Sequence, residues 1–426
     1  MTSTYLRRVV DDELDELLPE LPAIAIDGPK GVGKTATAMN HARTVYRLDD
    51  PDTRQLITAD ISRLTVGDPP ILIDEHQRWE PSWDLVRRAV DDDASPGRFL
   101  LTGSATPRHP SSHSGAGRIV GLRMRPMTLP ERGLVVPTVS LSGLLSGTPG
   151  RIEGDSAFAL ADYAHAIVRG GLPGTQQMSD RAARLALSGY THLIVDRDVP
   201  EAGQGVRNPT QMRAWLRALA AATATTASWE SLREATTPGH GDKPARSTTR
   251  PWTDALERTW ISEPLEPWLP GFNHLGRLGT TAKHHLADPA LACALLGLDE
   301  NDLLSGKEAT PRVPREGVFL GALFESLVAL TVRVFGQAAE GTVGHLRRRS
   351  GDHEVDFVVS GPGGRRVALE AKLSALVDDK DVRHLLWLKG ELGDELTDMV
   401  VVTTGRHAYR RQQDGVAVVP LALLGP

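Results

Sequence analysis

The sequence predicts an α/β fold in which a parallel sheet has helices on both faces. Two observations carry this prediction. Apolar runs of strand length alternate with segments of helical period, and the first run leads through a glycine-rich turn into a helix. The runs expected as strands are AIAID (23–27), PPILIDE (69–75) and RFLLTGS (98–104). The segments expected as helices around them are 4–18, 34–46 and 83–92.

The pattern changes twice further along the chain, which predicts three domains, at 1–150, 151–300 and 311–426. The middle domain reads as helical, and two short helices, a polar loop and a third helix suggest a winged helix-turn-helix. A polar stretch at 301–316 is expected to be a linker. The amphipathic helix GVFLGALFESLVALTVRVF then leads into a last group of strands. They are expected near 343–348, 354–360, 366–371 and 398–403.

The composition excludes several classes of protein. Cys293 is the single cysteine among 426 residues, so a disulfide framework and a cysteine-rich zinc site are excluded, and a reducing cytoplasm is expected. The formal net charge is −6, so any contact with nucleic acid must come from a local basic patch. There is no apolar leader and no uninterrupted apolar run of about 18 residues, so we expect no membrane segment.

A phosphate-binding motif follows the first expected strand. Residues 28–35 read GPKGVGKT, which is the pattern G-x-x-x-x-G-K-T. Its glycines let the backbone N–H groups wrap a phosphate, at the positive end of the next helix. Lys34 would reach the β- and γ-phosphates of ATP, and Thr35 would place its hydroxyl on Mg²⁺. The residues expected to bind ATP in this loop are Gly28, Pro29, Lys30, Gly31, Val32, Gly33, Lys34, Thr35 and Ala36.

The next two strands end in polar residues that suit ATP hydrolysis. ILIDEHQRW (71–79) offers Asp74 to hold Mg²⁺ and Glu75 to polarise the attacking water. The same acidic pair could merely cap a helix. The third strand ends in Thr102 and Ser104, which could sense the γ-phosphate or position the water, or simply end the strand.

Arg118 is a candidate arginine finger. Such a residue, supplied by a neighbouring subunit, stabilises the charge of the transition state. This role would require a homo-oligomer. Most surface arginines have no function of this kind, and that alternative stays open.

Together these motifs resemble bacterial and archaeal AAA-like P-loop ATPases that carry a C-terminal restriction-endonuclease-like domain. The resemblance extends over nearly the whole chain, although Lys30 replaces an arginine of the family pattern and Ala105 a serine. The matching elements are GPKGVGKT, ILIDEHQ, LTGSA, AGR with Pro126 and Glu131 after it, GGLPG (170–174), LIVDRDV and DPALACALLG (288–297). The resemblance implies an ATPase core, a winged-helix middle, a nuclease-like end, DNA association and oligomers.

The hairpin HEVDFVVSGPGGRRVALEAK (353–372) carries the residues of a nuclease-like site. Asp356 precedes the Glu370-Ala371-Lys372 triplet by 14 residues, and side-chain alternation puts Glu370 and Lys372 on one face. Paired carboxylates bind Mg²⁺, which activates water, and Lys372 would orient or deprotonate that water. Glu325 matches the helix acid of the family and is expected to complete the metal site, with Glu354 as a further ligand. A charged, solvated hairpin is the alternative.

Three functions therefore stay open. The first is a DNA-associated ATPase whose nucleotide state controls a metal-dependent nuclease. The second is a nucleotide-dependent switch or scaffold whose C-terminal domain binds DNA or a protein without cleavage. The third is a regulator that binds a protein partner. The arginines at 347–349 could hold a phosphate backbone, or could lie on a solvated hairpin edge.

Overall fold

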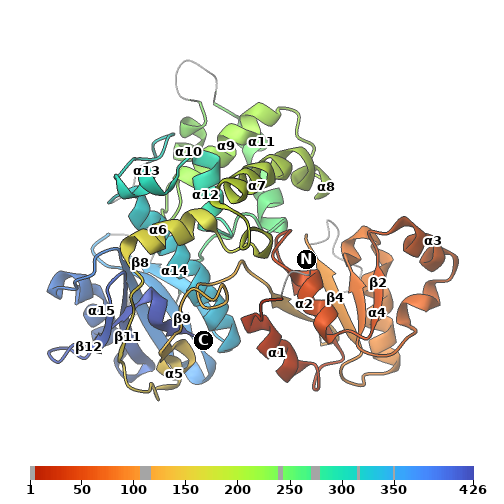
Figure 1. The fold of residues 1–426 in the computed structure, drawn as a ribbon, viewed down its shortest axis with the longest axis horizontal. Helices are drawn as coiled ribbons and strands as arrows, with labels where there is room; N and C mark the ends of the chain where they lie inside the picture. Colours follow the sequence, from red (N-terminus) through yellow and green to blue (C-terminus); the bar gives the residue numbers. More distant parts are fainter. Residues whose placement is uncertain (1–4, 106–116, 238–242, 270–278, 314–316, 349–350) are drawn as a thin grey trace.

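The computed structural model describes residues 5–105, 117–237, 243–269, 279–313, 317–348 and 351–426. Figure 1 shows three blocks. The N-terminal block, in red and orange, stands to one side. The middle block, in yellow and green, and the C-terminal block, in blue, are packed against each other.

The N-terminal block is a five-stranded sheet in the order β2-β3-β4-β1-β5, with every strand pair parallel. The strands are β1 (Ala23–Asp27), β2 (Thr44–Arg47), β3 (Ile71–Asp74), β4 (Phe99–Gly103) and β5 (Val120–Arg123). The helices around them are α1 (Val9–Leu17), α2 (Lys34–His41), α3 (Pro51–Ala59) and α4 (Pro81–Asp92). Residues facing both sides of β1 and β4 belong to apolar cores, so the predicted parallel sheet with covered faces is confirmed.

The helix expected at 34–46 was predicted too long. It ends at His41, because Ala42 adopts an extended conformation with φ −89° and ψ 148°. The chain then forms β2, whose residues pair with β3 from Thr44 to Arg47. This short strand depends on its neighbour for stability, so tertiary pairing overrides the local helical pattern.

The middle block is a group of helices, as expected. They are α6 (Leu160–Arg169), α7 (Asp180–Leu193), a π-helical turn (Ile194–Asp198), α8 (Val199–Glu201), α9 (Pro209–Ala221), α10 (Trp229–Ala235), α11 (Arg246–Arg258), α12 (Pro289–Leu296) and α13 (Glu300–Leu304). Helix α12 packs on α6, α7 and α9. After α11, two antiparallel bridges pair Ser262 with Leu286 and Leu265 with Lys283. The winged-helix reading stays a prediction, and α13 begins the stretch that was expected to be a linker.

The C-terminal block is a mixed sheet on a long helix. Its elements are α14 (Phe319–Ala338), β8 (Thr342–Arg347), β9 (Glu354–Ser360), β10 (Arg366–Lys372), α15 (Asp379–Leu392), β11 (Leu396–Thr403), β12 (His407–Arg410) and β13 (Ala417–Pro420). Strands β8, β9 and β10 are antiparallel, and β10, β11 and β13 are parallel. Helix α14 is long and apolar enough to cross a membrane, but 83% of its apolar window is buried inside the protein.

A segment that precedes the middle block also packs with the C-terminal block, partly through a separate two-stranded sheet. Strand β6 (Val139–Ser140) pairs with β14 (Leu424–Gly425), and β7 (Gly154–Asp155) pairs with β12. Between them, α5 (Leu141–Ser146) packs on α14 and β11. The boundary expected near residue 150 therefore falls inside a stretch that packs with the C-terminal block.

Candidate functional site

The glycine-rich loop between β1 and α2 has the geometry of a phosphate cradle. Gly31 and Gly33 have φ of 80° and 102°, a region that favours glycine. At Gly28, an added Cβ would lie 2.2 Å from the carbonyl oxygen of Met124, so the close approach requires glycine as well. The Lys34 side chain is buried, and its Nζ donates to the carbonyl oxygens of Gly28 at 2.8 Å and Pro29 at 2.9 Å. Burial lowers the pKa of Lys34 to about 8, although Glu75 partly offsets the effect.

A cluster of oxygens lies beside the loop, at the carboxyl ends of β3 and β4. The Asp74 Oδ1 accepts hydrogen bonds from the Thr35 Oγ1 at 2.7 Å and from the Thr102 Oγ1 at 2.5 Å. A threonine hydroxyl and a carboxylate are the hard oxygen ligands that Mg²⁺ prefers. Thr35 and Asp74 therefore fit the predicted metal beside a bound nucleotide, whereas Thr102 lies fully buried beneath them.

Glu75 is fixed in position at both its backbone and its side chain. Its φ of 56° lies in the left-handed region, which is uncommon for a residue other than glycine and clusters at functional sites. The backbone N–H donates to the Thr102 Oγ1 at 3.1 Å. The carboxylate accepts from the Ser104 Oγ at 2.9 Å and from the Gln77 Nε2 at 2.6 Å. Ser104 thus orients Glu75, a contact that the sequence motif did not specify.

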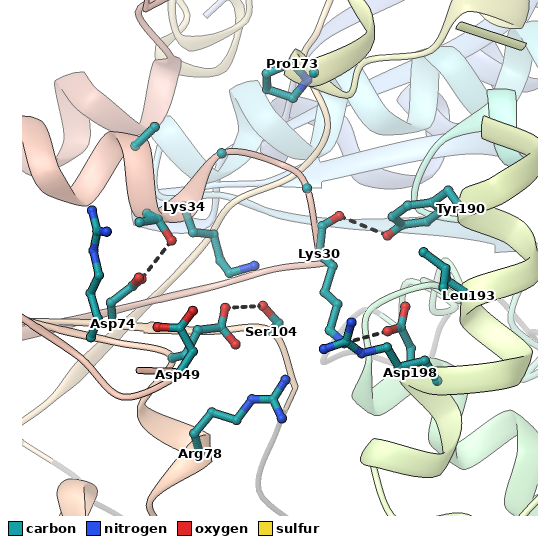
Figure 2. Close-up of a pocket in the computed structure, with 18 of the residues that line it drawn as sticks. Lys30, Lys34, Asp49, Asp74, Arg78, Ser104, Pro173, Tyr190, Leu193 and Asp198 are labelled. Carbon is teal, nitrogen blue, oxygen red and sulfur yellow. Dashed lines mark hydrogen bonds and ion pairs between the residues drawn. The ribbon is translucent and has the colours of Figure 1, made fainter. Parts of the chain in front are cut away.

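The phosphate loop opens into a cavity of about 1010 Å³ that has walls from two blocks. The N-terminal block contributes Lys30, Lys34, Thr35, Ala36, Asp74, Glu75 and Ser104, together with Arg47, Asp49, Arg54 and Arg78. The middle block contributes Pro173, Gly174, Tyr190, Leu193, Arg197 and Asp198. Figure 2 shows Tyr190 and Asp198 on the side of the cavity that faces Lys30. A nucleotide in this cavity would therefore contact both blocks.

Lys30 connects the two walls. Its Nζ lies 2.5 Å from the Asp198 Oδ1 and 2.7 Å from the Glu201 Oε2, and its backbone carbonyl accepts from the Tyr190 hydroxyl at 3.0 Å. These contacts were not predicted. Their signal was present in the motif LIVDRDV, whose residues form the π-helical turn that brings Asp198 to the cavity; such turns are frequent at functional sites.

Arg8 supports the loop from behind and was also missed. Its Nη1 donates to the Val32 carbonyl at 2.9 Å, and its Nη2 donates to the Arg125 carbonyl at 2.7 Å. The Nε forms a buried ion pair with the Glu131 Oε1 at 2.9 Å. This gives a structural reason for the glutamate in the family pattern.

Arg118 does not line the cavity of its own chain. Its Nε lies 2.6 Å from the Asp91 Oδ1 on α4, and its side chain is 45% exposed. Action on the same chain's nucleotide therefore has no support from its position. A role in a neighbouring subunit stays a prediction.

The acidic residues predicted for the C-terminal site do come together. Asp356 on β9, Glu370 and Lys372 on β10 and Glu325 on α14 lie at one end of the hairpin. The Asp356 Oδ2 accepts from the Ala371 backbone N–H at 3.0 Å, and the Lys372 Nζ lies 3.0 Å from the Glu370 Oε2.

A lysine that the sequence did not indicate lies among these acids. The Lys283 Nζ is 2.9 Å from the Glu325 Oε1, 2.8 Å from the Glu354 Oε1 and 2.9 Å from the Asp356 Oδ1. Burial lowers the pKa of Lys283, but the three carboxylates outweigh this and hold that pKa well above its ordinary value. Burial, with the nearby Asp356, raises the pKa of Glu325 to about 7.

The predicted Mg²⁺ at Glu325, Asp356 and Glu370 does not fit this arrangement. Across the described ranges, no three His, Cys, Asp or Glu side chains form a group that could hold a metal ion. The carboxylates converge on an ammonium group instead. Of the arginines at 347–349, Arg347 contacts Glu354 and Arg348 contacts Asp352, while residue 349 lies outside the described residues.

A glycine-rich phosphate loop, a threonine beside an aspartate and an acidic pair at the carboxyl edge of a parallel sheet are the pattern of a P-loop ATPase domain. The comparisons agree for this block, because residues 20–132 match the AAA domain family. The N-terminal block is thus an AAA-like P-loop ATPase domain, the class of protein that binds and hydrolyses ATP. Residues 160–302 and 320–424 match the domains of unknown function DUF8612 and DUF4143.

Two mycobacterial proteins are similar to this chain over most of their length. Uncharacterized protein Rv2008c of Mycobacterium tuberculosis and Uncharacterized protein Mb2031c of Mycobacterium bovis are each 26% identical over 413 residues. Each alignment covers 93% of this chain and 82% of the relative. Among solved structures, the Walker-type ATPase PABY2304 of Pyrococcus abyssi aligns with a TM-score of 0.40 at 14% identity, over 69% of this chain and 97% of that one.

Proposed function

We propose that the protein is an ATP-hydrolysing switch, in which the nucleotide changes how the middle block docks on the ATPase domain. The observation that carries this proposal is the Lys30 contact. An ammonium group on the phosphate loop itself holds Asp198 and Glu201 of the middle block across the nucleotide cavity. Of the functions left open by the sequence, this favours the nucleotide-dependent switch.

In this proposal, residues of the cavity bind the phosphates, hold the metal and polarise water for hydrolysis. Lys34 binds the β- and γ-phosphates, for which its Nζ must leave the loop carbonyls that it now contacts. Thr35 and Asp74 hold Mg²⁺, which when bound neutralises phosphate charge. Glu75, oriented by Ser104 and Gln77, accepts a hydrogen bond from the attacking water and polarises it.

Nucleotide binding is coupled to docking of the middle block because the γ-phosphate competes with Asp198 and Glu201 for the Lys30 ammonium group. A γ-phosphate brings negative charge next to the loop and attracts the same ammonium group that pairs with Asp198 and Glu201. A ligand shifts a conformational equilibrium by its differential affinity for the two states. ATP is therefore expected to favour a state with a weakened Lys30–Asp198 contact, and phosphate release to restore it.

The C-terminal block is proposed to bind a partner without cleaving it. The order α14, β8, β9, β10, α15, β11 supports a restriction-endonuclease-like topology, and the resemblance makes DNA the expected partner. However, Lys283 neutralises the acids that would bind a catalytic metal. Binding therefore has more support than cleavage.

The test is an ATPase assay on the full chain with Mg²⁺, alone and with single-stranded, double-stranded and branched DNA. Lys34→Ala should abolish nucleotide binding. Glu75→Gln should bind ATP and lose turnover, while Glu80→Gln, the same change at an exposed residue, should keep it. Wild-type turnover in Glu75→Gln would contradict the role given to Glu75. If no DNA binds to the protein and none stimulates its ATPase activity, the DNA partner is refuted. If the protein cleaves DNA and Asp356→Ala abolishes this cleavage, the nuclease function is restored.

We also propose that the active form is a homo-oligomer in which Arg118 reaches the cavity of a neighbour. Its exposure at a distance from its own cavity supports this role. Mixing Arg118→Ala, which keeps an intact cavity, with Lys34→Ala, which keeps the arginine, should restore ATPase activity. No recovery in mixed oligomers would count against the finger.

A further inference from the structure

A side cavity of about 280 Å³ opens from the nucleotide cavity, between the ATPase domain and the middle block. The residues that line both cavities are Lys30, Arg54, Arg78, Ser104 and Asp198. Lys34 and Thr35, which would hold the phosphates and the metal, line only the larger one. In the view of Figure 2, Ser104 lies between Lys34 and Arg78. The side cavity therefore begins next to the place where the γ-phosphate of ATP would lie.

The side cavity is lined by more positive than negative groups. Its cations are Lys30, Arg54 and Arg78, and its carboxylates are Asp198 and Glu201. Lys30 already pairs with both carboxylates, at 2.5 and 2.7 Å. Arg78 has only a long contact with Glu201, at 3.4 Å. An anion in this cavity would therefore meet two guanidinium groups, which are suited to tetrahedral oxyanions because they donate pairs of parallel N–H bonds.

Two buried polar atoms of residues that line the side cavity have no hydrogen-bond partner among the described residues. They are the Arg54 Nε, a donor, and the Gln77 Oε1, an acceptor. The Gln77 Nε2 donates to the Glu75 carboxylate, which fixes the orientation of the amide. Buried atoms of this kind are costly to leave unpaired, so they indicate a ligand that both accepts and donates hydrogen bonds. Inorganic phosphate is such a ligand, whereas the fully ionised γ-phosphoryl group of ATP has no hydroxyl group to donate.

Hydrolysis produces this ligand at the entrance of the side cavity. The water oxygen bonds to the γ-phosphorus, and the bond between that phosphorus and the β–γ bridging oxygen breaks. The products are ADP and dihydrogen phosphate, which keeps both hydrogens of the water and later releases one to solvent. We propose that the side cavity is a subsite for this product phosphate, where Arg54 and Arg78 bind its oxygens and the Gln77 Oε1 accepts its hydroxyl group. This inference rests on the proposed hydrolysis of ATP.

A phosphate in the side cavity prolongs the state in which the middle block is released. The cavity is lined by Lys30, Asp198 and Glu201, the same residues that form the contact between the two blocks. A bound phosphate attracts the ammonium group and repels the two carboxylates, so the contact re-forms only after the phosphate has left. The duration of the switched state is therefore set by phosphate release.

The experiment measures binding of radiolabelled orthophosphate to the full chain by equilibrium dialysis, with saturating ADP and Mg²⁺. The wild type should bind one phosphate per chain. Arg54→Met and Arg78→Met should each weaken this binding about ten- to hundredfold, because each removes a charge-assisted hydrogen bond. Arg88→Met is the matched control: this arginine is exposed on α4 and lines neither cavity, so the phosphate affinity should not change.

Sulfate provides a second test that needs no substitution. In mildly alkaline buffer both ions are tetrahedral dianions, but only hydrogen phosphate has a hydroxyl group to donate to the Gln77 Oε1. Sulfate should therefore compete about tenfold more weakly than unlabelled phosphate in the wild type, because it leaves this acceptor unpaired. Gln77→Leu removes the acceptor and should abolish most of this preference.

Wild-type phosphate affinity in either Arg54→Met or Arg78→Met, or equal affinities for sulfate and phosphate in the wild type, overturns the subsite. ATP turnover measured on the same preparations separates this result from the proposed function. If the wild type hydrolyses ATP and the arginine variants bind phosphate normally, only the subsite is refuted. A wild type that does not hydrolyse ATP refutes the proposed function, and the product subsite with it.

Discussion

Thr102→Val tests how the hydroxyl of Thr102 positions Asp74 and the Glu75 proposed to polarise the attacking water. The substitution keeps the shape of the side chain and removes one oxygen. In the wild type this buried oxygen donates to the Asp74 Oδ1 at 2.5 Å and accepts from the Glu75 N–H at 3.1 Å. Valine therefore removes one of the two donors that fix Asp74 and leaves the Glu75 N–H without its acceptor.

The size of the effect follows from these two bonds. A hydrogen bond to a charged group contributes about 1.5–3 kcal/mol, and a buried N–H without a partner costs about 1–3 kcal/mol. The hydrogen bond from the Glu75 N–H to the Thr102 Oγ1 supports the left-handed backbone at Glu75. Part of the lost hydrogen-bond energy should therefore appear as a misplaced Glu75 carboxylate. Since about 1.4 kcal/mol corresponds to tenfold in rate, we expect kcat for ATP to fall about 10- to 100-fold.

The assay is steady-state ATP hydrolysis by the full chain, with nucleotide affinity measured in parallel. Affinity should stay within about threefold, because Thr102 lies beneath the cavity and does not line it. Thr102→Ser is the control and should keep most of the rate, since it retains the hydroxyl. Wild-type kcat in Thr102→Val, or an equal loss in Thr102→Ser, would refute the positioning role.

Three further predictions concern the loop. Lys30→Met should lower the thermal unfolding midpoint, because it leaves the Asp198 side chain, 6% exposed, without its cation; Asp198→Asn in the same chain should recover part of the loss, and an unchanged midpoint would count against the contact. Gly28→Ala should abolish ATP binding by calorimetry, because the added Cβ would lie 2.2 Å from a carbonyl oxygen, whereas Gly189→Ala, in open space, should bind normally. ATP affinity should be constant below pH 8 and fall up to tenfold per pH unit above it: the pKa of Lys34 in the free protein is about 8, and binding the charged form then takes up a proton. A fluorescent-nucleotide titration that stays flat from about pH 7 to 10 would contradict this.

The sequence was most informative where the chemistry is local. The phosphate loop is one contiguous pattern, and the acid after β3 follows directly from a strand end, so both were placed correctly. Strands β2 and β5 were missed, because each has four residues and gains its stability from pairing within the sheet. Their local composition carries too weak a signal to distinguish them from a helix end or a loop.

The ion pairs that connect the nucleotide cavity and the C-terminal acids to the middle block join residues far apart in the sequence. Lys30 meets Asp198 across 168 residues, and Lys283 meets Asp356 across 73. No local spacing connects such pairs, and a lysine alone in a polar stretch has no distinctive pattern. The acids of the C-terminal site were identified from their hairpin, but the cation that neutralises them comes from another block, so the sequence reading favoured a metal there.

The pairing partners of β6 and β7 are synthesised late, which fixes the order in which the blocks can fold during translation. Both leave the ribosome well before their partners β14 and β12, which lie more than 250 residues further on. At a translation rate of about 5–20 residues per second, the early strands wait on the order of tens of seconds. During this interval the ATPase sheet is complete while the C-terminal sheet is not. A nascent chain paused in the middle block would therefore carry a folded nucleotide site beside an unprotected strand edge, which is a stage where chaperones would be expected to act.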